Sequence, residues 1–218
     1  MSTSTSIAPQ RRGRSGLRLA LAAGAGVVLL AAMALDTRVV RIGGAGDAQP
    51  GVFSPAAYGA AEFPKVQAAV ASRAVAAPVL AEALAKDPEA AAKRYGVAAN
   101  GSPEYPVSFT GTLGQEDSGN YDVKVDGMPE GVVVKVQTGP AIMGTDLRDG
   151  TGTVSFGQFT NQIEYQNAGS ALNKEMKKQV LSKIDTAGLA GKTVTVVGVF
   201  QATDPKSWLV TPVRMEVK

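Results

Sequence analysis

The chain contains neither cysteine nor histidine. It can therefore form no disulfide bond, thiolate nucleophile, Ser-His-Asp triad or zinc site with nitrogen and sulfur ligands. A site built from carboxylates alone remains open. The absence of thiols suits an oxidising compartment, where a free cysteine could mispair. Aromatic residues make up only 6% of the chain, so the rings that gather between residues 156 and 165 stand out.

Basic residues are in excess only near the N-terminus. Residues 1–46 hold six arginines and one acidic residue, a net charge of +5, whereas the whole chain carries +3. The other 172 residues therefore carry a net charge of −2. Nucleic-acid binding requires a basic surface, so we expect no nucleic-acid partner.

Leu19–Leu35 runs for 17 residues without a charge. As a helix it would extend about 26 Å, close to the roughly 30 Å of bilayer hydrocarbon, and the arginines before it belong on the cytoplasmic side. We predict a disordered basic segment over residues 1–16 and a transmembrane anchor over residues 17–36. The protein would then be a single-pass protein of a bacterial inner membrane, with its C-terminal domain in the periplasm. The alternative is a signal sequence cleaved near Ala34, at Ala-Met-Ala.

Residues 37–53 are rich in glycine and are predicted to be a linker, after which helix signals recur. Ser54-Pro55 and Asp87-Pro88 each place an N-cap before a proline, and Gly96 is a stop signal. Pro64 and Pro78 interrupt the alanine-rich sequence between them. Residues 54–100 are therefore predicted to form two helices or one kinked helix, followed by a short one. Their apolar stripe is expected to pack on the next domain, or alternatively to bind a partner.

The periodicity changes to alternation after residue 104, which indicates strands. The predicted strands cover residues 107–113, 121–125, 132–136, 153–159, 193–200 and 208–217. One helix, Ala171–Ile184, precedes the last two of them. We predict an α+β chain in which residues 101–218 form a small OB-like antiparallel β-barrel. Its first two segments would count as one long bent strand or an added hairpin.

Polar and aromatic residues concentrate between Gly139 and Asn173. Amides and a phenol can hydrogen-bond a neutral polyol, and aromatic faces can stack on its apolar side. We name as candidate ligand or partner contacts Asp146, Arg148, Phe159, Asn161, Gln162, Tyr165 and Asn173. The alternative is that these side chains satisfy backbone groups where a strand leaves the barrel. The Asp146 turn lacks the alternating ligands and final glutamate of a calcium loop, so we expect no metal and no cofactor.

Several short motifs resemble a family of predicted periplasmic lipoproteins of unknown function. The similarity extends from about Val39 to the C-terminus and rests on Tyr95-Gly96, Gly139-Pro140, Gly144 to Asp149, Phe156, Phe159, Asn161-Gln162, Tyr165, Ala171 to Asn173, Gly191-Lys192, Gly198 and Phe200. Family members are often encoded beside sugar ABC transporters, so the resemblance implies an accessory role in solute uptake. The family's lipobox cysteine is missing, with Leu35-Asp36-Thr37 in its place, which favours the uncleaved anchor.

No spacing of acidic residues singles out a catalytic pair. We therefore expect a non-enzymatic, membrane-anchored periplasmic accessory protein that works with a sugar-type ABC uptake system through protein or small-ligand binding. A soluble periplasmic binding module, released near Ala34, is the alternative. A carboxylate-based hydrolase and an OB-type nucleic-acid binder are less favoured.

Overall fold

The computed structural model describes residues 14–36, 52–99 and 101–218, and the chain divides into two compact units, Met1–Asp47 and Ala48–Lys218. Helix α1 (Arg14–Asp36) in the first unit covers the uncharged segment. Within the described part of the chain, no helix combines the length and the apolar character needed to cross a membrane. The single-pass anchor stays a prediction.

The second unit begins with three helices, α2 (Pro55–Arg73), α3 (Ala77–Lys86) and α4 (Pro88–Tyr95). As predicted, the Ser54 and Asp87 side chains cap α2 and α4 by accepting backbone N–H bonds, of 3.4 and 3.0 Å. Pro64 does not interrupt the chain as expected but lies inside α2. Burial of Phe63, Val66 and Val70 on the same helix offsets the one hydrogen bond that proline removes.

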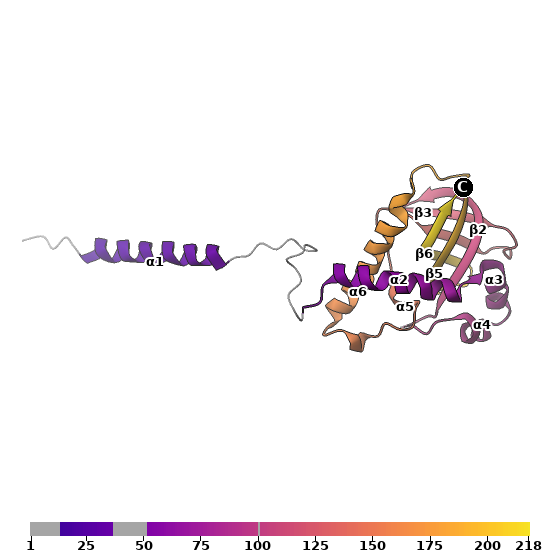
Figure 1. The fold of residues 1–218 in the computed structure, drawn as a ribbon, viewed down its shortest axis with the longest axis horizontal. Helices are drawn as coiled ribbons and strands as arrows, with labels where there is room; N and C mark the ends of the chain where they lie inside the picture. Colours follow the sequence, from indigo (N-terminus) through magenta and orange to yellow (C-terminus); the bar gives the residue numbers. More distant parts are fainter. Residues whose placement is uncertain (1–13, 37–51, 100) are drawn as a thin grey trace, which may run out of the picture. The chain divides into compact units, whose positions relative to one another are not determined.

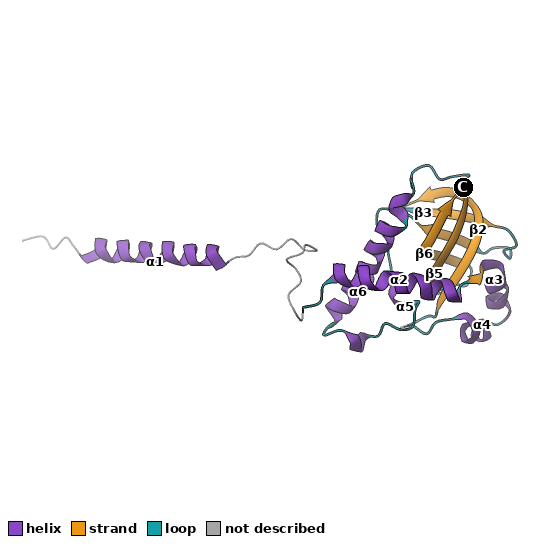
Figure 2. Ribbon diagram, in the orientation of Figure 1, coloured by secondary structure: helices purple, strands orange, loops and turns teal. Residues whose placement is uncertain are grey.

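Five longer strands form the sheet (Figure 2): β2 (Glu104–Asp117), β3 (Asn120–Val125), β4 (Val133–Gln137), β6 (Ser207–Val217) and β5 (Thr193–Gln201). Each pairs with the next in this order, and β5 also pairs with β2, so the strands form a closed circuit. A two-residue strand, β1 (Val75–Ala76), adds to β2. The prediction of a purely antiparallel sheet is wrong, because β4–β6 and β1–β2 pair in parallel.

Residues 153–159 do not form the predicted strand. They hold a single 3₁₀ turn, η2 (Phe156–Gln158), because the rings of Phe156 and Phe159 pack on other aromatic rings rather than on a neighbouring strand. Residues 107–113 and 121–125 lie in two separate antiparallel strands, β2 and β3. The interpretation of these two segments as one long bent strand is therefore wrong. A short helix, α5 (Asp146–Asp149), follows β4.

The predicted helix exists but begins nine residues earlier than expected. Helix α6 (Gln162–Gln179) precedes the last two strands, and a 3₁₀ turn, η3 (Leu181–Lys183), covers most of the remaining predicted span. Helix α2 crosses α6 (Figure 1), and their backbones approach so closely at Gly59 that an added Cβ would lie 2.7 Å from the carbonyl oxygen of Ala171. The helices therefore pack within the second unit, as predicted for the apolar stripe.

The core contains a ladder of stacked rings inside the circuit of strands. Tyr105 and Phe200 stack with ring centroids 5.7 Å apart, and Phe200 and Trp208 stack at 4.5 Å. All three side chains are buried. At Gly198 a β-bulge brings β6 so close that an added Cβ would lie 2.6 Å from the carbonyl oxygen of Thr211.

Candidate functional site

The centre of the candidate site is a buried ion pair between consecutive residues of α5. The guanidinium group of Arg148 donates from Nε to Oδ1 of Asp149 and from Nη2 to Oδ2, both at 2.8 Å. The two side chains are only 7% and 8% exposed. A two-pronged pair of this kind is directional as well as strong, so it fixes the orientation of both side chains.

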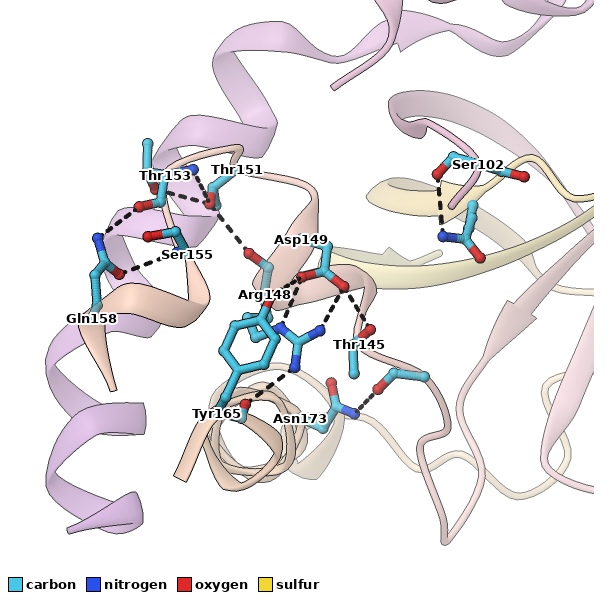
Figure 3. Close-up of polar contacts among 12 residues, drawn as sticks. Ser102, Thr145, Arg148, Asp149, Thr151, Thr153, Ser155, Gln158, Tyr165 and Asn173 are labelled. Atoms are coloured by element: carbon cyan, nitrogen blue, oxygen red, sulfur yellow. Dashed lines mark hydrogen bonds and ion pairs between the residues drawn. The ribbon is translucent and has the colours of Figure 1, made fainter. Parts of the chain in front are cut away.

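Tyr165 of α6 completes this centre (Figure 3). Its carbonyl oxygen accepts from Nη1 of Arg148 at 3.1 Å, and its hydroxyl donates to Oδ1 of Asp149 at 3.3 Å. The Arg148 guanidinium lies 3.6 Å from the centre of the Tyr165 ring, in cation–π contact. Thr145 donates to the other Asp149 oxygen at 2.7 Å. Both carboxylate oxygens therefore have partners within the protein.

A chain of hydrogen bonds holds the loop after α5 against this centre. Thr151 donates to the carbonyl oxygen of Arg148 at 3.3 Å, and the hydroxyl groups of Thr151 and Thr153 lie 2.9 Å apart. Gln158 donates to the carbonyl oxygen of Thr153 at 3.0 Å. The loop is thereby fixed from residue 151 to η2.

Aromatic rings connect this loop to the start of α2. Phe159 lies 5.5 Å from Phe53, 5.7 Å from Tyr58 and 5.4 Å from Tyr165, measured between ring centroids. Phe156 meets Tyr165 edge to face, with centroids 5.7 Å apart and planes at 88°. Phe156 is nevertheless 51% exposed, so one ring of the cluster is open to a ligand.

A hollow of about 390 Å³, the α5–α6 hollow, lies where α5, α6 and the loop between them meet residues 98–99. Its lining includes Ala98, Asp149, Gly152, Ser155, Phe156 and Tyr165. A carboxylate, a phenol and a hydroxyl can hydrogen-bond a polar ligand, and the exposed ring can stack on an apolar face. Mixed walls of this kind are typical of small-ligand sites.

Asp146, at the start of α5, belongs to a different network. Its Oδ2 atom accepts from the Thr211 hydroxyl at 2.6 Å, and that hydroxyl accepts from Nε2 of Gln137 at 2.8 Å. Burial raises the pKa of Asp146 to about 6; the hydrogen bond from Thr211 opposes this shift and the charge of Asp149 adds to it. Asp146 therefore links α5 to β4 and β6.

Glu104, the first residue of β2, is the most deeply buried acidic residue of the described chain, at 1% exposure. Its Oε2 atom has no hydrogen-bond partner. Burial raises the pKa of Glu104 to about 8, the charges of Asp146 and Asp149 add to the shift, and the charge of Arg148 opposes it. The carboxyl group therefore carries a proton at neutral pH.

Asn161 and Asn173, two other predicted site residues, have structural contacts, and Gln162 is exposed. Asn161 caps α6, because its Oδ1 accepts from the N–H of Glu164 at 2.9 Å. Gln162 is the exposed first residue of that helix. Asn173 lies within α6 and donates to the carbonyl oxygen of Gly144 at 3.0 Å, so it ties the helix to the preceding loop. None of the three lines the α5–α6 hollow.

Four polar residues outside the predicted set belong to these two hydrogen-bond networks: Asp149 and Thr145 in the Arg148 centre, and Thr211 and Gln137 in the Asp146 network. Glu104 is also outside the predicted set, and its charge interacts with Asp146 and Asp149. The pairing of Asp149 with Arg148 has a sequence signal, because opposite charges are adjacent in a turn. Glu104 has none, since an acidic residue before an apolar run is usually exposed. Across residues 14–36, 52–99 and 101–218, no three acidic side chains are placed to hold one metal ion.

Of the residues that carry the motif resemblance, Arg148, Asp149 and Tyr165 meet at the junction of α5 and α6, and Asn173 ties α6 to Gly144. The family described as "Predicted periplasmic lipoprotein (DUF2291)" matches residues 25–216. The chain belongs to this family. Membership indicates a periplasmic location and supplies no activity, because the function of these lipoproteins is unknown.

A solved structure supports the fold of this DUF2291 chain. An OB-fold protein from Thermotoga maritima aligns with a TM-score of 0.61 at 20% sequence identity, covering 77% of this chain and 99% of the other. At this identity the likeness shows the fold alone. No curated protein matches the DUF2291 chain.

Proposed function

We propose that this chain is a non-enzymatic periplasmic accessory protein of a sugar-type ABC uptake system, held at the inner membrane by its N-terminal segment. The α5–α6 hollow takes a neutral polyhydroxylated ligand or the surface of a transporter component. The observation that carries the proposal is the combination in this hollow of a half-exposed Phe156 ring with the Asp149 carboxylate and the Tyr165 phenol. Sugars present the same combination of an apolar face and a rim of hydroxyl groups.

The state of the polar groups supports binding rather than catalysis. Both oxygens of Asp149 accept hydrogen bonds from Arg148, and Thr145 and Tyr165 donate to them as well. A general base must be free to take a proton, whereas this carboxylate is committed to its partners. It can add a hydrogen bond to a ligand without leaving its position.

The outer face of β3 and β4 gives no support to nucleic-acid binding. The exposed or half-exposed side chains there are Asn120, Asp122, Lys124, Val133 and Lys135, and Asp122 and Lys135 form a 3.4 Å ion pair. OB-folds that bind single strands stack bases on aromatic residues of this face. These five residues offer no ring and little net charge.

The ligand part of the proposal is tested by thermal-shift and calorimetric titration of the full chain with monosaccharides and sugar alcohols. Phe156→Ala removes the exposed ring from the hollow, and we expect at least a tenfold loss of affinity. Ile163→Ala is the matched control, because Ile163 is 68% exposed and lies outside the hollow. Equal affinity of the two variants for every bound sugar would remove the hollow from the account.

The partner part is tested by affinity capture from membranes that contain the transporter. Capture of permease or solute-binding subunits, lost in Phe156→Ala and kept in Ile163→Ala, is the expected result. Capture that neither substitution changes would place the contact elsewhere.

The anchored form rests on the arginines and the uncharged run of the sequence. Fractionation and the mass of the purified protein test it. Recovery with the membrane and an intact N-terminus is expected. A soluble periplasmic protein that begins after Ala34 would establish the cleaved alternative instead.

A further inference from the structure

A second hollow, the acidic hollow, has a volume of about 420 Å³ and is lined by Asp146 of α5, whereas Asp149 lines the α5–α6 hollow. Its polar lining includes Gln137, Asp146, Gln201, Thr203, Asp204 and Ser207. It contains two carboxylates, and neither lysine nor arginine is among the lining residues. Amide and hydroxyl oxygens supply further acceptors, so the walls favour a donor with a positive charge.

Glu104 does not line this hollow but is the strand neighbour of a residue that does. It lies directly opposite Gln201 in the β2–β5 ladder, and Gln201 lines the hollow. Its Oε2 atom is buried without a hydrogen-bond partner. Asp146, which also lines the hollow, is close enough for its charge to act on Glu104. The acidic hollow and the unpartnered Oε2 atom of Glu104 therefore belong to one region.

The charges around Glu104 do not balance. Asp146, Asp149 and Arg148, all on α5, act on its carboxyl group. Arg148 is fully engaged by Asp149 in a two-pronged pair. Glu104 and Asp146 thus share no further cation among the described residues, and burying uncompensated negative charge is unfavourable. A proton on Glu104 relieves this, and a positive ligand in the hollow would relieve it too.

We propose that the acidic hollow binds an organic cation, a primary ammonium or guanidinium group held by Asp146 and Asp204, and that this binding drives the proton of Glu104 into solvent. The carboxylic acid becomes a carboxylate, the ligand keeps its charge, and up to one proton leaves for each cation bound. Because the cation and the proton compensate the same negative charge, their binding is linked and competitive.

The walls suit an organic cation better than a metal ion. In the described residues, no three acidic side chains are close enough to bind one ion. Two exposed apolar side chains, Met143 at 68% and Leu209 at 40%, also line the hollow. They can cover the methylene groups of an alkylamine, as apolar surfaces cover the stems of lysine side chains.

The test is calorimetric titration of the full chain at pH 7 with 1,4-diaminobutane and with methylguanidine, in buffers of different ionisation enthalpy. We expect saturable binding of at least one probe, and a heat that changes with the buffer because a proton is released. Absence of saturable binding for both probes would overturn the proposal. So would binding whose heat is the same in every buffer.

Two substitutions separate the cation from the proton. Asp204→Asn should weaken binding about tenfold, while its Oδ1 still accepts the hydrogen bond from the N–H of Lys206, 2.9 Å in the native chain. Glu104→Gln should keep binding but abolish proton release. The control is Asp185→Asn, since Asp185 accepts the same type of bond from Ala187, at 3.1 Å, outside the hollow. Equal loss in Asp204→Asn and Asp185→Asn would contradict the assignment.

The acidic hollow and the α5–α6 hollow have no lining residue in common. Phe156→Ala should therefore leave amine binding unchanged, and Asp204→Asn should leave sugar binding unchanged. Loss of amine binding in Phe156→Ala would contradict a separate site. Failure of either hollow to bind its probe leaves the other proposal standing.

Discussion

Arg148 and Asp149 are neighbours in the chain, yet their side chains turn toward each other and form two hydrogen bonds of 2.8 Å. The ring of Tyr165 covers the guanidinium group, and the Tyr165 carbonyl oxygen takes a third N–H. Most ion pairs among the described residues have an exposed partner, as in Lys65 with Glu62. The α5 pair is therefore the one whose loss should affect stability most.

Removing Arg148 should leave the buried Asp149 carboxylate without a compensating charge. We expect Arg148→Met to lower the free energy of unfolding by about 3–5 kcal/mol, because Asp149 would lose its compensating charge. Arg148→Met with Asp149→Leu should recover part of this loss. Lys65→Met, which breaks an exposed pair, should cost less than about 1 kcal/mol. Urea denaturation measures all three, and equal losses for Arg148→Met and Lys65→Met would show that the α5 pair contributes little.

The buried acid Glu104 should make stability depend on pH. Its pKa is about 8 in the folded chain against 4.5 when unfolded, so the folded chain holds this proton more tightly and its stability falls as pH rises from 4.5 to 8. Asp146 acts likewise, but only up to about pH 6. Between pH 6 and 8 the slope should approach about 1.4 kcal/mol per unit.

Glu104→Gln imitates the protonated form and removes this titration. Its melting temperature should change less than that of the native chain between pH 6 and 8, and it should exceed the native value at pH 8. Thermal unfolding at several pH values checks this prediction. Parallel pH profiles for the two proteins would mean that another group titrates there.

Gly139 should resist substitution for a steric reason. Its backbone touches that of Gly119, which has a φ of +84°, so a Cβ at residue 139 would overlap the hairpin turn between β2 and β3. We expect Gly139→Ala to cost about 1–3 kcal/mol. Gly157 is the control, because a Cβ there meets nothing within 4 Å. Chemical denaturation of both variants measures the difference, and a neutral Gly139→Ala would refute the close approach.

Asn161 should act through the helix it caps. Its side chain satisfies the N–H of Glu164, and the Glu164 side chain in turn accepts from the N–H of Thr160 at 2.9 Å. Asn161→Ala should cost about 1 kcal/mol and Asn161→Asp much less, because aspartate also caps. Affinity for ligand should not change in either variant. A loss of ligand binding without loss of stability would return Asn161 to the binding site.

Local signals were enough to predict much of the fold. Ser54-Pro55 and Asp87-Pro88 start helices where expected, and the alternation in residues 121–125 gives β3. The alternation in residues 153–159 predicted a strand that does not form, because the aromatic residues of this segment pack on Phe53 and Tyr165, which are distant in sequence. Tertiary contacts of that kind override local periodicity.

The site was predictable only in part, for the same reason. The polar stretch between Gly139 and Asn173 contains Arg148 and Tyr165, which meet, but also Asn161 and Gln162, which do not line the hollow. Glu104 lies outside the stretch, at the start of β2, and the charges of Asp146, Asp149 and Arg148 act on its carboxyl group. Its burial at 1% exposure is a tertiary effect that no local pattern reveals.

The most direct test of the proposed binding role is an amide NMR titration of the isotopically labelled full chain with the panel of sugars and sugar alcohols, at millimolar concentration. We expect the resonances of Gly152, Ser155 and Phe156 to shift together and saturate, while those of β3 and β4 stay in place. Shifts confined to β3 and β4, or unchanged Gly152, Ser155 and Phe156 resonances with every compound, would contradict the proposed role.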